Sequence, residues 1–143
     1  MSDVNFVQVI QAVGALISAC LGGSALFYSM YAYTRTLKIS NYNELDKAYQ
    51  ILLTMALNNT YFVKPEEITT KEQQEKYDLY AFMMWNYLEA IYDKCLKDKH
   101  LGETWLPIIE VEGSLHSKWF FRKDNKDKFK ECFYKYIESL LKS

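Results

Sequence analysis

The sequence predicts an all-α protein with one N-terminal transmembrane helix followed by a small cytoplasmic helical bundle. Two observations lead to this fold class. The segment from Val4 to Thr34 contains no charged residue, which is typical of a helix in lipid. The whole chain has only two prolines and five glycines, and it lacks the alternating runs that mark strands. We therefore expect residues 1–39 to hold the transmembrane helix and juxtamembrane segment, and residues 40–143 to form the helical domain.

The uncharged segment is long enough to cross a bilayer. As a helix it would reach roughly 46 Å, against a hydrocarbon core of roughly 30 Å. It is too long for a secretory signal, and Asp3 is the only charge before it, where a signal would carry basic residues. Arg35 and Lys38 follow it, so the positive-inside rule places the N-terminus outside and the C-terminal domain in the cytoplasm. We expect a single-pass protein of the bacterial inner membrane, with the lipid bilayer as a partner.

One stripe of this helix carries small and polar side chains, spaced alternately three and four residues apart. Large apolar side chains such as Phe6, Leu16 and Leu21 occupy the rest of the circumference. The stripe does not suit lipid, and we expect no second span in the chain to cover it. Its neighbours would be other copies of the chain or another protein. The stripe, assigned to a pore or helix seam, consists of Gln8, Gln11, Ala15, Ser18, Gly22, Ala25 and Ser29.

Two interpretations of the stripe stay open. In the first, small residues let helices pack closely while Gln8 and Gln11 bond between them, at roughly 0.6–2 kcal/mol per bond. In the second, about four or more helices surround an axis and the same groups face a narrow aqueous path. A chain with one span can form such a path only as a homo-oligomer, which we take to be a tetramer.

The remaining residues predict a bundle of helices. The Ser40–Asn43 segment is expected to interrupt the first helix and cap a second, Glu44–Asn58. A loop with two aromatic residues follows, before a long central helix over Lys71–Lys97. The later elements that we expect are a short helix over Glu103–Val111 with Pro107 near its first turn, an irregular or partly helical segment over Gly113–Asn125 and a closing helix over Lys126–Leu141.

The net charge of −1 hides an uneven distribution. The region from Glu66 to Asp98 has eight acidic residues against four lysines, whereas Ser117–Ser143 has eight basic residues against four acidic ones. The two regions either neutralise each other, within or between subunits, or the basic one binds an anionic ligand or lipid headgroups. For an anionic ligand, the candidate residues are Lys118, Arg122, Lys123, Lys126, Lys128 and Lys130.

Catalytic and metal-binding patterns are weak, so we expect no enzyme, no cofactor and no metal site. His100 and His116 fall in expected loops without a recognisable nucleophile, and there is no glycine-rich phosphate loop. Cys20, Cys95 and Cys132 are scattered, which favours neither a disulfide framework nor a zinc site.

Asn86 and Glu89 are the unusual polar residues of the expected central helix. They lie among large apolar side chains, and a buried carboxylate needs a hydrogen-bond donor. We interpret Glu89 as a structural clasp that accepts from a backbone end, a tyrosine or Arg122, in preference to a catalytic role.

The pattern Trp85-Asn86-Tyr87-Leu88-Glu89-Ala90-Ile91-Tyr92, followed by Trp105-Leu106-Pro107 and Trp119-Phe120, resembles a family of small bacterial membrane proteins of unknown function. The plan of one span and a small helical domain also resembles the membrane effectors of antiphage systems, notably the channel effector of the Hailong system. That resemblance implies an oligomeric anion channel with a cytoplasmic domain that responds to an oligodeoxyadenylate made by a partner nucleotidyltransferase.

These observations give two expectations for function. The first is an oligomeric, ligand-gated membrane channel, conducting anions, that serves as an antiphage defence effector. Its cytoplasmic domain would bind an anionic signal, an oligonucleotide or a cyclic nucleotide from a partner nucleotidyltransferase. The alternative is a membrane-anchored adaptor whose helical bundle recruits a cytoplasmic partner. An adaptor needs only a dimer or a heteromeric neighbour, whereas a channel needs a symmetric assembly with solvated stripe residues.

Overall fold

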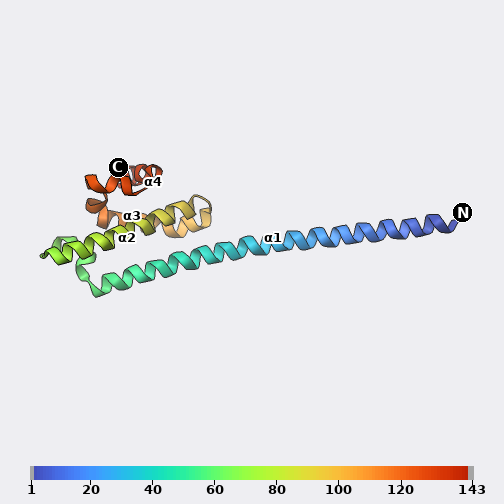
Figure 1. The fold of residues 1–143 in the computed structure, drawn as a ribbon, viewed down its shortest axis with the longest axis horizontal. Coiled ribbons are helices and arrows are strands. Elements are labelled where there is room, and N and C mark those ends of the chain that lie inside the picture. The colour runs from blue at the N-terminus through green and yellow to red at the C-terminus, as the bar shows by residue number, and fades with distance from the viewer. Residues whose placement is uncertain (1, 142–143) are drawn as a thin grey trace. The chain divides into compact units, whose positions relative to one another are not determined.

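The all-α fold class is confirmed. The computed structural model describes residues 2–141, with side chains from residue 6 onward, and this part of the chain contains helices and turns but no strand. A long apolar N-terminal helix precedes a group of helices (Figure 1). The chain divides into two units, Met1–Ser40 and Asn41–Ser143. The elements in chain order are α1 (Ser2–Asn58), η1 (Thr60–Phe62), η2 (Pro65–Glu67), α2 (Lys71–Cys95), α3 (Lys99–Phe120), η3 (Lys123–Lys128) and α4 (Glu131–Leu141).

The predicted break at Ser40–Asn43 is wrong, because α1 continues through it without interruption. Asn41 and Tyr42 have tertiary partners there. Lys94 donates to Asn41 Oδ1 at 3.0 Å, and the ring of Tyr42 packs edge-on against Trp105 at 5.5 Å. Leu45 then enters the core with 2 % of its surface exposed. Tertiary contacts of this kind override the local preference for a cap.

Helix α2 is the central element of the second unit. Thr70 begins it with a capping box, in which the Thr70 hydroxyl accepts from the Gln73 N–H and the Gln73 side chain accepts from the Thr70 N–H. Apolar side chains that recur at the helical period along α2 are buried, among them Tyr77, Met84, Leu88 and Ile91, and so is Trp85. The Trp85 ring stacks on Phe120 of α3 at 4.0 Å, and its Nε1 donates to the backbone oxygen of His116 at 3.2 Å. Helices α2 and α3 therefore pack face to face (Figure 1).

Helix α3 corrects a second prediction, because one continuous helix from Lys99 to Phe120 replaces the expected short helix and includes the first part of the segment after it. Pro107 lies inside this helix on an exposed position, where its ring meets solvent. Gly113 remains helical because its missing side chain admits Trp85. A Cβ atom at Gly113 would lie 3.3 Å from the Trp85 ring. Gly113 therefore does not end the helix; the absence of a side chain there lets the Trp85 ring pack closely against α3.

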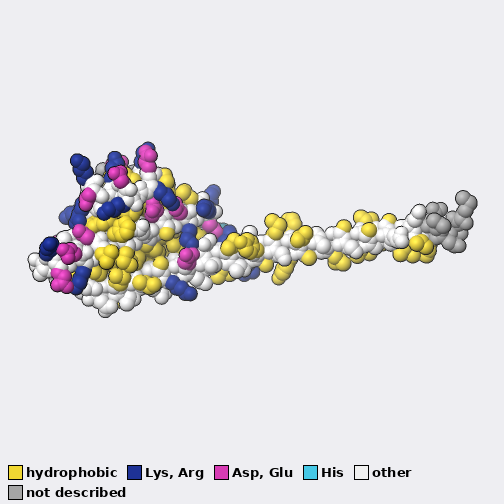
Figure 2. Space-filling view, in the orientation of Figure 1, with side chains coloured by type: hydrophobic (Ala, Val, Ile, Leu, Met, Phe, Trp, Pro, Cys, Tyr) yellow, Lys and Arg dark blue, Asp and Glu magenta, His cyan; other side chains and the backbone are white. Residues whose placement is uncertain are grey.

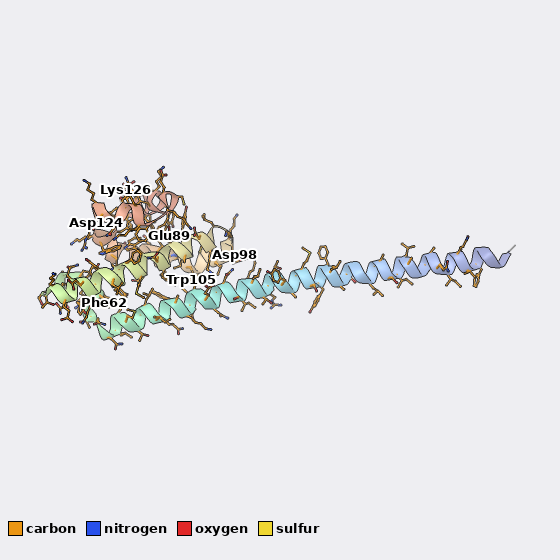
Figure 3. The ribbon with its side chains drawn as sticks, in the orientation of Figure 1. Phe62, Glu89, Asp98, Trp105, Asp124 and Lys126 are labelled. Carbon is orange, nitrogen blue, oxygen red and sulfur yellow. The ribbon has the colours of Figure 1, made fainter. Side chains whose placement is uncertain are left out.

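The segment between α1 and α2 contributes an aromatic side chain to the core of the second unit. Phe62 is buried and stacks on Tyr80 at 4.4 Å (Figure 3). At the other end, the closing helix α4 begins at Glu131, later than predicted, and buries Phe133 and Ile137. The turn before it contains the buried Asn125, whose amide donates to the Trp119 backbone oxygen at 2.7 Å.

Glu89 holds the start of α4. Its Oε1 accepts from the backbone N–H of Lys130 at 2.8 Å, and the Lys130 ammonium pairs with Asp93 one turn further along α2. Glu89 lies on α2 and is half-buried (Figure 3). The expected hydrogen bond of Glu89 is therefore present, with a backbone end as the partner. Asn86, by contrast, is exposed and donates to the Phe82 backbone oxygen of its own helix at 2.7 Å.

We predict that Glu89→Ala lowers the free energy of unfolding of the helical unit by about 1–2 kcal/mol, because the Lys130 N–H loses a charged acceptor. Chemical denaturation followed by tryptophan fluorescence measures this. Glu89→Gln keeps an acceptor oxygen and should recover about half of the loss. If the alanine variant unfolds like the wild type, Glu89 does not hold α4.

Candidate functional site

The first candidate site is the small and polar stripe of α1. Among the described helices, α1 contains the segment that is long and apolar enough to cross a membrane. Side chains of the stripe are exposed in a single chain, as are the large apolar residues around them. Figure 2 shows yellow hydrophobic side chains along this segment, while most of the dark blue and magenta charged side chains lie on the second unit. A surface of this kind requires lipid or protein neighbours.

Hydrogen bonding separates two kinds of polar residue on this helix. Ser24 donates to the Leu21 backbone oxygen at 2.9 Å, and Thr36 donates to that of Ala32 at 2.9 Å. These hydroxyls are satisfied within the helix. The amides of Gln8 and Gln11, within the described part of the chain, have no such partner. Their bonding capacity is therefore left for groups outside the chain.

The glycine of the stripe has room around it in the single chain. A Cβ atom at Gly22 would meet no atom within 4 Å, and the same holds at Gly23 on another face. The glycines are thus not explained by packing within one chain. A close approach by another helix is the usual reason for a small residue on a membrane helix.

The second candidate site is the basic region, whose six cations do not form one patch. Two of them pair with acidic residues of α2. Arg122 Nη1 lies 2.8 Å from Asp78 Oδ1, and Lys130 pairs with Asp93. Neutralisation within the chain, one of the two interpretations of the charge distribution, therefore accounts for these two residues.

The lysines of η3 have different surroundings. Lys128 donates to Asn125 Oδ1 at 2.6 Å and lies 5.4 Å from the centre of the Trp119 ring. Lys126 (Figure 3) lies 5.7 Å from the centre of the Tyr134 ring. These cation–π contacts hold the two lysines against the protein. Lys123 is exposed, and among the described residues it has no ionic partner.

A groove brings together two of the predicted anion-binding residues, Lys118 and Arg122. Its volume is about 260 Å³. One wall comes from η2 and the residues after it, a second from α2 and a third from the C-terminal part of α3. Its lining consists of Pro65, Glu66, Ile68, Gln74, Tyr77, Ser114, Leu115, Ser117, Lys118, Trp119 and Arg122.

A chain of buried polar side chains crosses the interior of the second unit. Tyr49 Oη donates to Glu112 Oε1 at 2.8 Å, and Glu112 Oε2 lies 3.9 Å from His116 Nε2. On the other side of the ring, His116 Nδ1 lies 3.1 Å from Tyr77 Oη. We assign the neutral ring a hydrogen on Nε2, so that Nδ1 accepts from Tyr77.

The placement of His116 corrects the prediction that both histidines lie in loops, because α3 contains both. His116 is fully buried, and burial lowers the pKa of its imidazole to about 4. Burial also raises the pKa of the Tyr77 hydroxyl to about 12. Three polar atoms of the described interior are left without a hydrogen-bond partner, namely Tyr87 Oη, Trp105 Nε1 and His116 Nε2.

The sequence contained a signal for this polar chain that residue-type patterns missed. Trp105, Ile109, Glu112 and His116 are spaced four, three and four residues apart, which places them on one face of a helix. With α3 expected to end before Glu112, that periodicity was cut short. No cluster of three or more potential metal-ligating side chains occurs among the described residues.

Comparison with known proteins found no matching family model, no similar curated protein and no similar solved structure.

We predict that acid destabilises the second unit through His116. The unfolded chain binds a proton near pH 6.5, whereas the folded chain, in which Tyr77, Tyr80 and Glu112 surround the ring, binds it near pH 4. Stability present above pH 6.5 is therefore lost as the pH falls toward 4, by about 3 kcal/mol. Urea denaturation at a series of pH values measures the loss.

The matched variants are His116→Phe and His100→Phe, since His100 is an exposed histidine of the same helix. His116→Phe should remove this part of the pH dependence, and His100→Phe should keep it. Equal pH slopes for both variants would contradict the assignment.

Proposed function

We propose that the chain is an oligomeric membrane channel, gated by its helical unit in response to an anionic ligand. The observation that carries this proposal is the stripe of α1, where Gln8, Gln11 and Ser18 are exposed and the two glutamine amides have no partner among the described residues. Around an axis of symmetry these groups would replace the hydration of a passing ion. The large apolar side chains on the rest of the helix would face lipid.

The assembly and orientation are part of the same proposal. A pore needs about four helices, so we propose a homo-tetramer of single-pass chains. Arg35 and Lys38 follow the uncharged run, and this asymmetry supports an N-terminus outside and a helical unit in the cytoplasm of a bacterial cell. The resemblance in plan to antiphage channel effectors supports anion conduction and a role in defence.

The ligand part of the proposal rests on fewer residues than the basic composition implied. Arg122 and Lys130 are paired with acidic residues, and Lys126 and Lys128 lie against aromatic rings. Lys118 and Arg122 are the cations that share a groove. A ligand held there would bias the helical unit, and through it the conducting path, by its difference in affinity for the open and closed states.

We predict that Gly22→Leu disrupts the assembly while leaving the helical unit folded, because a large side chain on the stripe separates the helices. Light scattering of the protein in detergent gives the oligomeric mass. Gly23→Leu is the matched control, since a Cβ atom at Gly23 also meets no atom within 4 Å but the residue lies off the stripe. An unchanged mass for Gly22→Leu would mean that the contact lies on another face.

We predict that Ser18→Leu abolishes ion flux across liposomes without changing the oligomeric mass, because a ring of leucines leaves a dry constriction. Ser24→Leu is the same chemical change off the stripe, at a hydroxyl already bonded within the helix, and should retain flux. If wild-type protein leaves liposomes tight with every ligand tried, the membrane-anchored adaptor becomes the better reading.

A further inference from the structure

The groove on the helical unit has a cationic end that is only partly neutralised. Lys118 is exposed and, among the described residues, has no ionic partner. Arg122 uses one guanidinium nitrogen for Asp78, and a guanidinium has five N–H donors in all. Two cations with remaining donors, on one wall of a groove, suit the several oxygens of a phosphate group.

The other polar groups of the groove have lone pairs to offer. Ser114 and Ser117 donate their hydroxyl protons to the backbone oxygens of Glu110 and Ser114. The amide nitrogen of Gln74 donates to Asp78 at 2.8 Å, which leaves its carbonyl oxygen as an acceptor. The carboxylate of Glu66 adds two more acceptor oxygens. A ligand that meets these groups must bring hydroxyl or amino donors of its own.

The size of the groove limits the ligand further. At about 260 Å³ it lies just below the roughly 300–1,000 Å³ that is usual for small-molecule pockets. A volume of this size suits a single nucleotide unit rather than an extended oligonucleotide. The apolar part of the wall, formed by Pro65, Ile68 and Leu115, offers a place for a non-polar portion of the body.

We propose that this groove binds a small phosphate ester whose body carries hydroxyl or amino donors. The phosphate contacts Lys118 and Arg122, and the body donates to Gln74, Glu66 and the serine oxygens. Sugar phosphates, nucleoside monophosphates and lipid headgroups share this chemistry. The proposal rests on the proposed function only in treating this ligand as the signal; the binding itself does not require that the chain conduct ions.

The experiment is calorimetric titration of the full chain in detergent, with adenosine monophosphate and glucose 6-phosphate as separate probes. At least one should bind more tightly than inorganic phosphate, and also more tightly than the unphosphorylated adenosine or glucose, by about tenfold or more, because each half forms only some of the contacts. Equal affinity for inorganic phosphate would show a site for any anion and would overturn the proposal. Displacement of both probes by short-chain phosphatidylglycerol would assign the groove to a lipid headgroup.

Charge variants locate the site. Lys118→Glu should weaken binding about tenfold or more, whereas Lys123→Glu, the same change at an exposed lysine that does not line the groove, should have little effect. Asp78→Asn should tighten binding several-fold, since it releases Arg122 while retaining an acceptor for Gln74, and a gain cannot come from misfolding. Equal losses for the two lysine variants, or weaker binding by Asp78→Asn, would overturn the proposal.

Flux measurements separate this inference from the channel proposal. Binding that is lost with Lys118→Glu, together with liposomes that never conduct, would leave the groove assigned and refute the channel. Conducting liposomes together with no binding of any probe would refute the groove and leave the channel standing.

Discussion

The structure depends on a length of helix whose large apolar side chains are exposed within the described part of the chain. Side chains of α1 from Phe6 to Tyr31 are exposed, and leaving apolar area in water costs roughly 25 cal/mol per Å². Lipid can cover the face of Leu16 and Leu21, but it offers nothing to the amides of Gln8 and Gln11. The two kinds of surface on one helix therefore call for two kinds of neighbour, and this requirement leads to the proposed oligomer.

The helical unit shows which parts of a fold can be predicted from sequence. The long central helix was predicted because its apolar periodicity depends on residues close together in the chain. The break expected at Ser40–Asn43 and the helix end expected at Val111 were wrong because distant residues decide them. Lys94 donates a hydrogen bond to Asn41, and the Trp85 ring occupies the space beside Gly113. An asparagine or a glycine ends a helix only where no tertiary contact holds that residue within the helix.

The same distinction holds for the candidate sites. Sequence alone identified the stripe of α1, since its spacing is local, and it identified the cations. It could not show that Asp78 and Asp93, from α2, neutralise Arg122 and Lys130. Nor could it show that Gln74 and Glu66 meet Lys118 in one groove. The buried chain from Tyr49 to His116 was missed because its members come from three helices. The net charge marked a whole basic region as a candidate site. The ion pairs with α2 reduce the number of cations that are left for a ligand.

The central claim is that the stripe of α1 faces water inside an oligomer, and thiol accessibility tests it most directly. In a chain with Cys20, Cys95 and Cys132 replaced by alanine, single cysteines would be introduced along α1 and treated in liposomes with a membrane-impermeant thiol reagent. We predict fast modification at Ala15, Ser18, Gly22 and Ala25, and slow modification at Leu16, Ile17 and Leu21. Protection at all of these positions, or modification without the period of the stripe, would contradict the account.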